Sequence, residues 1–365
     1  MNRLFRHGLC LALAVGLALP AGMAPAAAQM AGPDLSAATG AVFLPFLNAP
    51  APGEAIARTP KLEIRFPGGR KRRAVMDTGS TGVVVSANLI PNLSQLPQLG
   101  PGSLTYSSSG QIEKGVWVQT PLTLRGADGT RVTTRPMPVL AVQEVACMPK
   151  ARRCRPNPNP THIAMVGVGF ARQHDHQAQS TPDHNPLLSI EGMGAPGQPG
   201  AMRRGYVVSR AGVLVGLDVP STQGFTFLKL EKSPIYPDWQ AVPGCLSVAG
   251  RTPPACGTML MDTGVTTMYL KVPPEQLSGL TAPDAKDQPA LVPGTSVSVS
   301  VTGAQGISYS FAAGDTANPV APLNVVLVGR DTNPTPFVNT SVRFLNGFDY
   351  LYDADGGYVG FRPLK

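Results

Sequence analysis

The sequence predicts a mainly β protein built from two similar lobes, and three observations support this prediction. The chain holds 40 Gly and 38 Pro among 365 residues, which is typical of many turns and many short strands. Segments rich in Val, Thr and Leu recur between the turns, whereas helical patterns are sparse. The segment AVMDTGST (74–81) has a counterpart in LMDTGVTT (260–267), and their Asp residues lie 185 positions apart, a spacing that suits two homologous lobes rather than a solenoid.

In chain order, four parts are expected. Residues 1–28 are a signal peptide, and residues 29–58 form an N-terminal extension. Residues 59–204 form the N-terminal lobe together with a hairpin flap and a polar connector, and residues 205–365 form the C-terminal lobe.

The N-terminus is typical of a secretory signal peptide. Arg3 and Arg6 form a basic start, and the apolar run Leu9–Leu19 follows. Ala26 to Ala28 then fit a small-residue cleavage site before Gln29. The apolar run is too short for an ordinary membrane-spanning helix, although an uncleaved anchor is the alternative. We therefore expect an exported protein of bacterial type, either periplasmic or secreted.

Export allows the cysteines of the mature chain to form disulfides. Cys147 and Cys154 flank one short loop, and Cys245 and Cys256 flank another. The sequence alone permits three pairings, of which two local disulfides are the simplest. A zinc site built from all four cysteines is the alternative, although their spacing fits poorly.

The formal charge of +8 falls to +6 when Arg3 and Arg6 leave with the signal peptide. Basic residues cluster at 68–74 and 150–155. The first cluster is expected to be a solvated hairpin turn, and the alternative is attraction to an anionic envelope surface. A nucleic-acid partner is not expected, because no stacking aromatic residues are interleaved in these clusters.

Strand patterns dominate the mature chain. Alternating or β-branched segments, each ending at Gly or Pro, lie at 61–66, 74–76, 116–126, 130–143, 212–219, 226–230 and 295–303. Short helices are expected from Asn185, which is a plausible cap followed by Pro, and from Pro273.

The connector at 172–204 is rich in Gln, Pro, Gly and His. This composition favours a polar link between the lobes. A metal site is the alternative, because the segment contains possible ligands: His174, Asp175, His176, Asp183 and His184.

The repeated Asp needs a chemical reason, because an ionised carboxylate is costly to bury in an apolar strand. A Gly two residues after each Asp lets the backbone turn sharply and lets another chain approach. A single copy could be a simple turn. If Asp77 and Asp262 meet at the lobe interface, their like charges cannot both ionise cheaply, so the pair shares one proton. Such a pair could deprotonate a water while protonating a substrate carbonyl.

The chain resembles the two-lobed, pepsin-like aspartic proteases over most of its mature length. The first Asp loop is similar to that of the family, and the segment LTYSSSGQIEKGVWV resembles the family's flap hairpin. Further similar segments are IAMVGVGF (163–170), GVLVGLD (212–218), the second Asp loop (255–266) and the closing stretch (342–361).

This resemblance implies roles for the matching residues. Asp77 and Asp262 would hold the attacking water, and Tyr106 on the flap would order the substrate. The remaining matching residues would support the site. Gly79 and Gly264 would let the two loops abut, and Thr78 and Thr263 would bridge the loops. Ser80 would donate a hydrogen bond to Asp77, and Gly167 would support the first loop.

Three residues depart from the family pattern. Val265 stands where many members have Ser or Thr, so it cannot donate a hydrogen bond to Asp262. Ser341 falls at the expected second supporting glycine, and Val84 replaces a Trp that usually bonds the flap tyrosine. Asn339 begins an Asn-Thr-Ser glycosylation sequon, which carries little weight in a bacterial-type sequence.

The resemblance predicts a monomeric aspartic endopeptidase that hydrolyses extended polypeptides at acidic pH without a metal or an organic cofactor. A noncatalytic binding protein on the same scaffold is the first alternative, because fold does not determine function. A carbohydrate-binding or structural β-sandwich, with the repeat arising by chance, is the second.

Overall fold

The computed structural model describes residues 32–149, 151, 154–175, 177–195, 198, 200–329 and 335–364. The predicted signal peptide (1–28) lies outside the described residues. Within these ranges no helix has the length and apolar character needed to cross a membrane.

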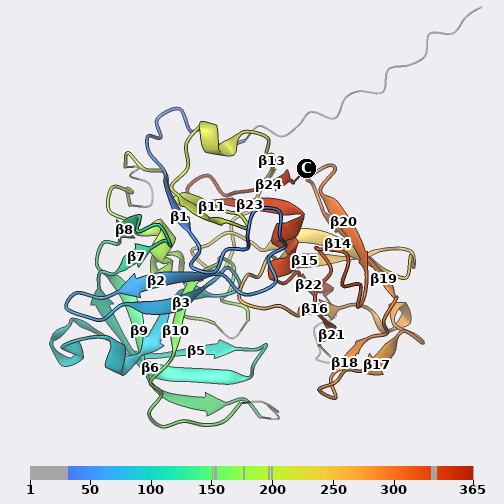
Figure 1. Cartoon of the computed structure of the whole chain (residues 1–365), viewed down its shortest axis with the longest axis horizontal. Helices are drawn as coiled ribbons and strands as arrows, with labels where there is room; N and C mark the ends of the chain where they lie inside the picture. Colours follow the sequence, from blue (N-terminus) through green and yellow to red (C-terminus); the bar gives the residue numbers. More distant parts are fainter. Residues whose placement is uncertain are drawn as a thin grey trace, which may run out of the picture.

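The predicted mainly β, two-lobed fold is confirmed. Three sheets make up the molecule: one nine-stranded sheet in each lobe and a six-stranded sheet that joins the lobes (Figure 1). The N-terminal sheet contains β2 (Lys61–Arg65), β3 (Arg72–Asp77), β4 (Thr81–Ser86), β5 (Gln98–Tyr106), β6 (Gln111–Thr120), β7 (Thr123–Arg125), β8 (Arg131–Thr133), β9 (Met137–Cys147) and β10 (Ala164–Val168).

The C-terminal sheet, drawn mainly in orange in Figure 1, lies on the opposite side of the molecule. It contains β14 (Val242–Val248), β15 (Ala255–Leu260), β16 (Met268–Lys271), β17 (Thr281–Pro283), β18 (Pro289–Leu291), β19 (Ser296–Val301), β20 (Ser308–Ala312), β21 (Val325–Leu327) and β22 (Phe337–Asn339).

The two nine-stranded sheets repeat one topology. The N-terminal order is β5-β6-β9-β4-β10-β3-β2-β7-β8, and the C-terminal order is β17-β18-β21-β16-β22-β15-β14-β19-β20. In each sheet the strand that leads to an Asp pairs in parallel with a later strand, as β3 with β10 and β15 with β22. The long-range repeat in the sequence therefore reflects two lobes with matching strand order.

The six-stranded sheet draws its strands from distant parts of the chain. Its order is β1 (Val42–Pro45), β12 (Gly212–Val215), β11 (Gly205–Val208), β23 (Phe348–Asp353), β24 (Tyr358–Pro363) and β13 (Thr226–Lys229). Residues of the expected N-terminal extension thus form its edge strand, which pairs antiparallel with β12.

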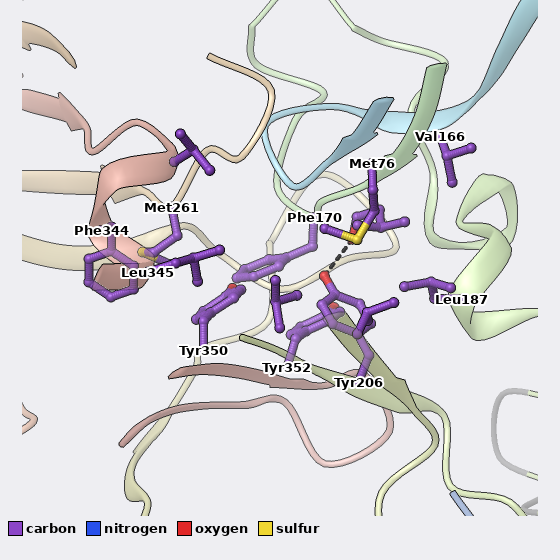
Figure 2. Packing of buried hydrophobic residues seen from close by; sticks show 14 of the residues in the cluster. Met76, Val166, Phe170, Leu187, Tyr206, Met261, Phe344, Leu345, Tyr350 and Tyr352 are labelled. Carbon is purple, nitrogen blue, oxygen red and sulfur yellow. Dashed lines mark hydrogen bonds between the residues drawn. The ribbon is translucent and has the colours of Figure 1, made fainter. Parts of the chain in front are cut away.

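Aromatic side chains of this shared sheet pack beneath both Asp loops. Figure 2 shows Tyr206, Tyr350 and Tyr352 below Met76 and Met261, the residues that directly precede the two aspartates. Phe170 stacks on Tyr352 with ring centroids 4.2 Å apart, and all of these side chains belong to one continuous buried cluster. Because the interior is close-packed, this layer supports both loops from one side.

The helical elements of the described chain are single 3₁₀ segments. They are η1 (Ala87–Leu89), η2 (Leu93–Gln95), η3 (Pro182–His184), η4 (Pro186–Leu188), η5 (Pro220–Thr222), η6 (Pro274–Gln276) and η7 (Val342–Asn346). The cap predicted at Asn185 is present, because its side chain accepts a hydrogen bond from the Leu187 N–H at 3.0 Å. The segment from Pro273 forms η6.

The connector (172–204) packs against the N-terminal lobe and is not only a solvated link between the lobes. Gln177, Ser180 and Asn185 are buried, and the Gln179 side chain accepts hydrogen bonds from the Ser103 N–H and from Trp117 Nε1. The connector therefore packs on the N-terminal lobe beside the flap strands β5 and β6.

Both predicted local disulfides are present, and they exclude the four-cysteine zinc site. Cys147 pairs with Cys154, and Cys245 pairs with Cys256. Cys245 and Cys256 face each other in the β14–β15 ladder, so their bond crosslinks that hairpin. The basic turn at 68–73 is mostly exposed between β2 and β3, as predicted, whereas Lys150, Arg152 and Arg153 of the second cluster lie outside the described residues.

Replacing Cys245 and Cys256 together by Ser should lower the free energy of unfolding by about 2–3 kcal/mol, because the unfolded chain is no longer restrained by a short loop. Denaturant unfolding of the oxidised wild type and of this double variant measures the difference. Cys147→Ser with Cys154→Ser is the matched control and should cost a similar amount. Equal stability of wild type and the first double variant would contradict the expectation.

Candidate active site

Asp77 and Asp262 lie at the lobe interface, where the two loops abut. Asp77 ends β3 and Asp262 follows β15, and both residues are buried, with exposed fractions of 5% and 6%. A Cβ built on Gly79 would lie 2.3 Å from the Asp262 carboxyl carbon, and one on Gly264 would lie 2.4 Å from Asp77 Oδ1. Each carboxyl group therefore occupies the space that only a glycine leaves open in the opposite loop.

The two loops are joined by a reciprocal set of hydrogen bonds. The Thr78 N–H donates to Thr263 Oγ1, and the Thr263 N–H donates to Thr78 Oγ1, both at 3.0 Å. Each hydroxyl then donates across the interface, Thr78 to Met261 O at 2.5 Å and Thr263 to Met76 O at 2.8 Å. Both threonine hydroxyls are thereby used as donor and acceptor, and the bridging geometry expected of Thr78 and Thr263 is present.

Each carboxyl group accepts one backbone and one side-chain hydrogen bond. Asp77 Oδ1 accepts from the Gly79 N–H at 2.7 Å, and Oδ2 accepts from the Ser80 hydroxyl at 2.6 Å. Asp262 Oδ1 accepts from the Gly264 N–H at 2.7 Å. Its Oδ2 accepts from Asn339 Nδ2 at 2.5 Å.

Asn339 was not predicted as a site residue. It lies 77 residues beyond Asp262 and enters the site from β22, so no local motif connects the two. The sequence offers only an indirect indication of this residue: Val265 has no side-chain hydrogen-bond donor for Asp262, so another residue could supply one. Asn339 is 6% exposed and its amide faces Asp262, so it is not accessible as a glycosylation acceptor.

The electrostatics favour a shared proton. Burial raises the pKa of Asp262 to about 8, and the charge of Asp77 raises it too. The hydrogen bonds from Asn339 and from the Gly264 N–H act in the opposite direction. The net effect favours retention of a proton by the pair to a higher pH than an ordinary carboxyl group allows, and titration belongs to the pair as a unit.

Gly167 lies behind the first Asp loop. It pairs with Asp77 in parallel, and a Cβ built on it would lie 2.8 Å from both the Ser80 hydroxyl and Gly82 O. Any larger residue would displace Ser80, the donor to Asp77. This close approach gives the supporting role proposed for Gly167 a physical basis.

Ser341 holds the matching place in the C-terminal lobe. Asn339 pairs with Leu260 in parallel, so continuing this register by two residues brings Ser341 opposite Asp262. The backbone of Ser341 has φ 61° and ψ 175°, a region that is essentially restricted to glycine. A serine therefore occupies a glycine-type conformation here, and its hydroxyl caps η7 by accepting from the Arg343 N–H at 3.3 Å.

The flap tyrosine lies close to the candidate pair but lacks a hydrogen bond. The Tyr106 hydroxyl is buried and without a partner among the described residues. Burial raises the pKa of Tyr106 well above the usual range, and the charges of Glu113 and Asp77 add to the effect, whereas the nearby Ser80 hydroxyl acts in the opposite direction. Val84, at the place of the family's tryptophan, is fully buried in an apolar cluster and offers no donor.

Glu113 is a buried acidic residue near Tyr106 that was not predicted from the sequence. It lies on β6 opposite Leu104, on the same face of the hairpin as Tyr106. Glu113 is 4% exposed, its Oε2 has no hydrogen-bond partner among the described residues, and burial raises its pKa to about 8. The flap thus carries a neutral carboxylic acid on the face that bears Tyr106.

The possible metal ligands of the connector do not converge where they are described. In the described part of the chain no group of three or more His, Cys, Asp or Glu residues could hold a metal ion. Asp175 pairs with Arg172 instead, and the His184 ring packs at a tilt against Trp117, with ring centroids 4.4 Å apart. His176, which belongs to the same hypothesis, lies outside the described residues.

Comparison with known proteins agrees with this architecture. No family model and no curated protein matches the sequence. Among solved structures, the chain is similar to the crystal structure of the aspartic proteinase from Irpex lacteus, with a TM-score of 0.56 and 14% sequence identity. The match covers 89% of this chain and 98% of that protein. The chain therefore has the bilobal pepsin-like fold.

Glu113→Gln should become more stable relative to wild type as the pH rises from about 4.5 to about 8. In this window the unfolded wild type releases the Glu113 proton while the folded protein keeps it, so wild-type stability falls. The gain should reach roughly 4 kcal/mol near pH 8. Denaturant unfolding at pH 4, 6 and 8 measures it, and a difference that does not change with pH would refute the assignment.

Ser341→Gly should be more stable than Ser341→Ala by about 1 kcal/mol or more. Alanine keeps the unfavourable backbone conformation and loses the cap, whereas glycine relieves the conformation. Thermal or denaturant unfolding of the two variants, side by side, gives the difference. An alanine variant as stable as the glycine variant would show that the backbone at Ser341 is not strained.

Proposed function

We propose that this protein is an exported aspartic endopeptidase that hydrolyses polypeptides with a water activated by Asp77 and Asp262. The observation that carries the proposal is the buried pair itself, in which two carboxyl groups face each other across abutting loops and hold a proton between them. A protein that needed only stability would gain by replacing one of two buried carboxyl groups.

The chemistry follows from that shared proton. One carboxylate takes a proton from the water as it attacks the peptide carbonyl carbon, and the protonated carboxyl group donates to the carbonyl oxygen. The tetrahedral intermediate then collapses as a proton moves to the amine leaving group, which breaks the C–N bond. The backbone N–H groups of Gly79 and Gly264 orient the carboxyl groups throughout.

The substrate is proposed to be an extended polypeptide bound between the lobes, beneath the hairpin formed by β5 and β6. Extended peptides bind to such sites through their backbone, with alternate side chains in pockets. Tyr106 at the end of β5 would close over the peptide and exclude water. The apolar residues around both loops favour apolar side chains in the central subsites, and this chemistry needs no cofactor.

The setting of the enzyme is part of the proposal. Two disulfides favour an oxidising compartment, which agrees with the signal-peptide pattern and with a periplasmic or secreted bacterial protein. We propose a monomer with the lobe boundaries expected from the sequence, at 59–204 and 205–365.

A noncatalytic binding protein is the alternative, and specific observations favour it. The Tyr106 hydroxyl lacks a partner, and Val265 lacks the hydroxyl that Ser80 provides in the other loop. The hydrogen bond from Asn339 to Asp262 weighs against this alternative, because it restores the missing donor from another strand.

Asp77→Asn and Asp262→Asn should each lower peptide hydrolysis by about 10³-fold or more while leaving the fold intact, because either change removes the acid–base pair. Cleavage of a quenched peptide library between pH 3 and 9, with and without pepstatin, measures this. Asp284→Asn, at a half-buried loop aspartate outside the site, is the matched control and should retain activity.

Wild-type activity should rise along an acidic limb as one carboxyl group of the pair ionises, and it should fall at higher pH, above the usual carboxyl range, where the pair loses its shared proton. Hydrolysis by either active-site variant at the wild-type rate would contradict the two-carboxylate mechanism. Wild-type protein that binds peptides tightly but cleaves none would favour the binding protein.

A further inference from the structure

The two Asp loops match in backbone but differ in one hydrogen-bond donor. Ser80, three residues after Asp77, donates its hydroxyl to Asp77 Oδ2 at 2.6 Å. Val265 stands three residues after Asp262 and has no polar side-chain atom. Nevertheless Asp262 Oδ2 is not left without a donor, because Asn339 Nδ2 reaches it from β22 at 2.5 Å.

The orientation of the Asn339 amide is determined by its surroundings. Asn339 Oδ1 accepts a hydrogen bond from the Ser341 N–H at 3.1 Å, so the amide nitrogen must face Asp262. The residue is buried, and its backbone is held between Leu260 of β15 and Tyr269 of β16. Asn339 is thus held in place by the strand that carries it and by the backbone of the following turn.

An amide nitrogen and a hydroxyl are different hydrogen-bond partners. A serine hydroxyl can either donate to a carboxylate or accept from a protonated carboxyl group, whereas an amide NH₂ only donates. Asp262 Oδ2 must therefore remain an acceptor as long as the bond to Asn339 persists. On Asp77, in contrast, Ser80 allows either the ionised or the protonated form of Oδ2.

We propose that Asn339 is the positioning residue for Asp262, replacing the hydroxyl absent at Val265 and keeping the shared proton away from Asp262 Oδ2. The proposal rests on the proposed function, in which this proton is the one delivered to the substrate carbonyl. It deepens that function because the donor to Asp262 Oδ2 is an amide that can only donate, whereas the donor to Asp77 Oδ2 is a hydroxyl that can also accept, so the two loops are chemically unequal.

Removal of the donor is the first test. In Asn339→Ala the ionised form of Asp262 loses a hydrogen bond, so the apparent pKa values of the pair should rise by about one unit. This rise moves the acidic limb of the kcat/KM profile to higher pH and lowers kcat/KM about tenfold on that limb. Peptide hydrolysis between pH 2 and 9 measures it.

A rescue experiment separates this role from a merely structural one. Val265→Ser in the Asn339→Ala background places a hydroxyl where Ser80 stands in the other loop, and it should move the acidic limb back toward the wild-type position. It does not restore the hydrogen bond to the Ser341 N–H. Asn324→Ala is the matched control, since Asn324 donates to the half-buried Asp284, outside the site, at 2.6 Å, and it should leave the profile unchanged.

A readout that needs no activity distinguishes failure of this proposal from failure of the proposed function. Carboxyl ¹³C NMR titration, with the Asp262 signal assigned through Asp262→Asn, should show a higher apparent pKa in Asn339→Ala and its reversal by Val265→Ser. This pattern supports the proposal even if wild type cleaves no peptide, in which case only the proposed function fails. An unchanged titration in folded Asn339→Ala protein, or a shift that Val265→Ser does not reverse, overturns the proposal.

Discussion

The structure of the site depends on the exchange of hydrogen bonds between Thr78 and Thr263. Each side chain accepts from the backbone of the other loop and donates to the carbonyl that precedes the other aspartate. Because both loops are buried, any separation of the lobes would leave several polar groups without partners, which is costly. The glycines of the two abutting loops make this exchange possible, because they let the loops approach closely. The aromatic side chains of the six-stranded sheet pack beneath both loops and support them (Figure 2).

Around this symmetric centre the two lobes differ in chemistry. The nine-stranded sheets share one strand order, and both carboxyl groups accept from a backbone N–H two residues later. The side-chain donors come from different places, a loop serine in one lobe and a strand asparagine in the other. A glycine in one lobe likewise corresponds to a strained serine in the other. Backbone symmetry constrains where a polar atom must lie, but it does not determine which residue supplies that atom.

Sequence reasoning succeeded where the signal was local or repeated. The two Asp loops, the local disulfides, the cap at Asn185 and the alternation of the strands are all patterns within short windows. Asn339 and Glu113 were not predicted from the sequence, because their surroundings arise from pairing across a sheet and neither position carries a motif. The six-stranded sheet that joins the lobes was not predicted either, because its strands come from segments as distant in the chain as β1 and β24. The sequence shows that Val265 and Ser341 depart from the family pattern. Their consequences become clear only from β22 and the turn that follows it, which bring Asn339 and Ser341 next to the second Asp loop.

The shared sheet also has a consequence for the order of assembly. β23 and β24 follow every other strand of the described chain, yet β23 lies at the centre of this sheet and carries Tyr350 and Tyr352, which pack beneath both loops (Figures 1 and 2). A nascent polypeptide could form the first lobe's hairpins early, but the platform under the carboxyl pair stays incomplete until the last segment arrives. Late, non-local pairing of this kind favours slow folding, so a chain that ends before β23 would lack the support beneath both Asp loops. The geometry of the carboxyl pair therefore depends on strands that are synthesised after both lobes.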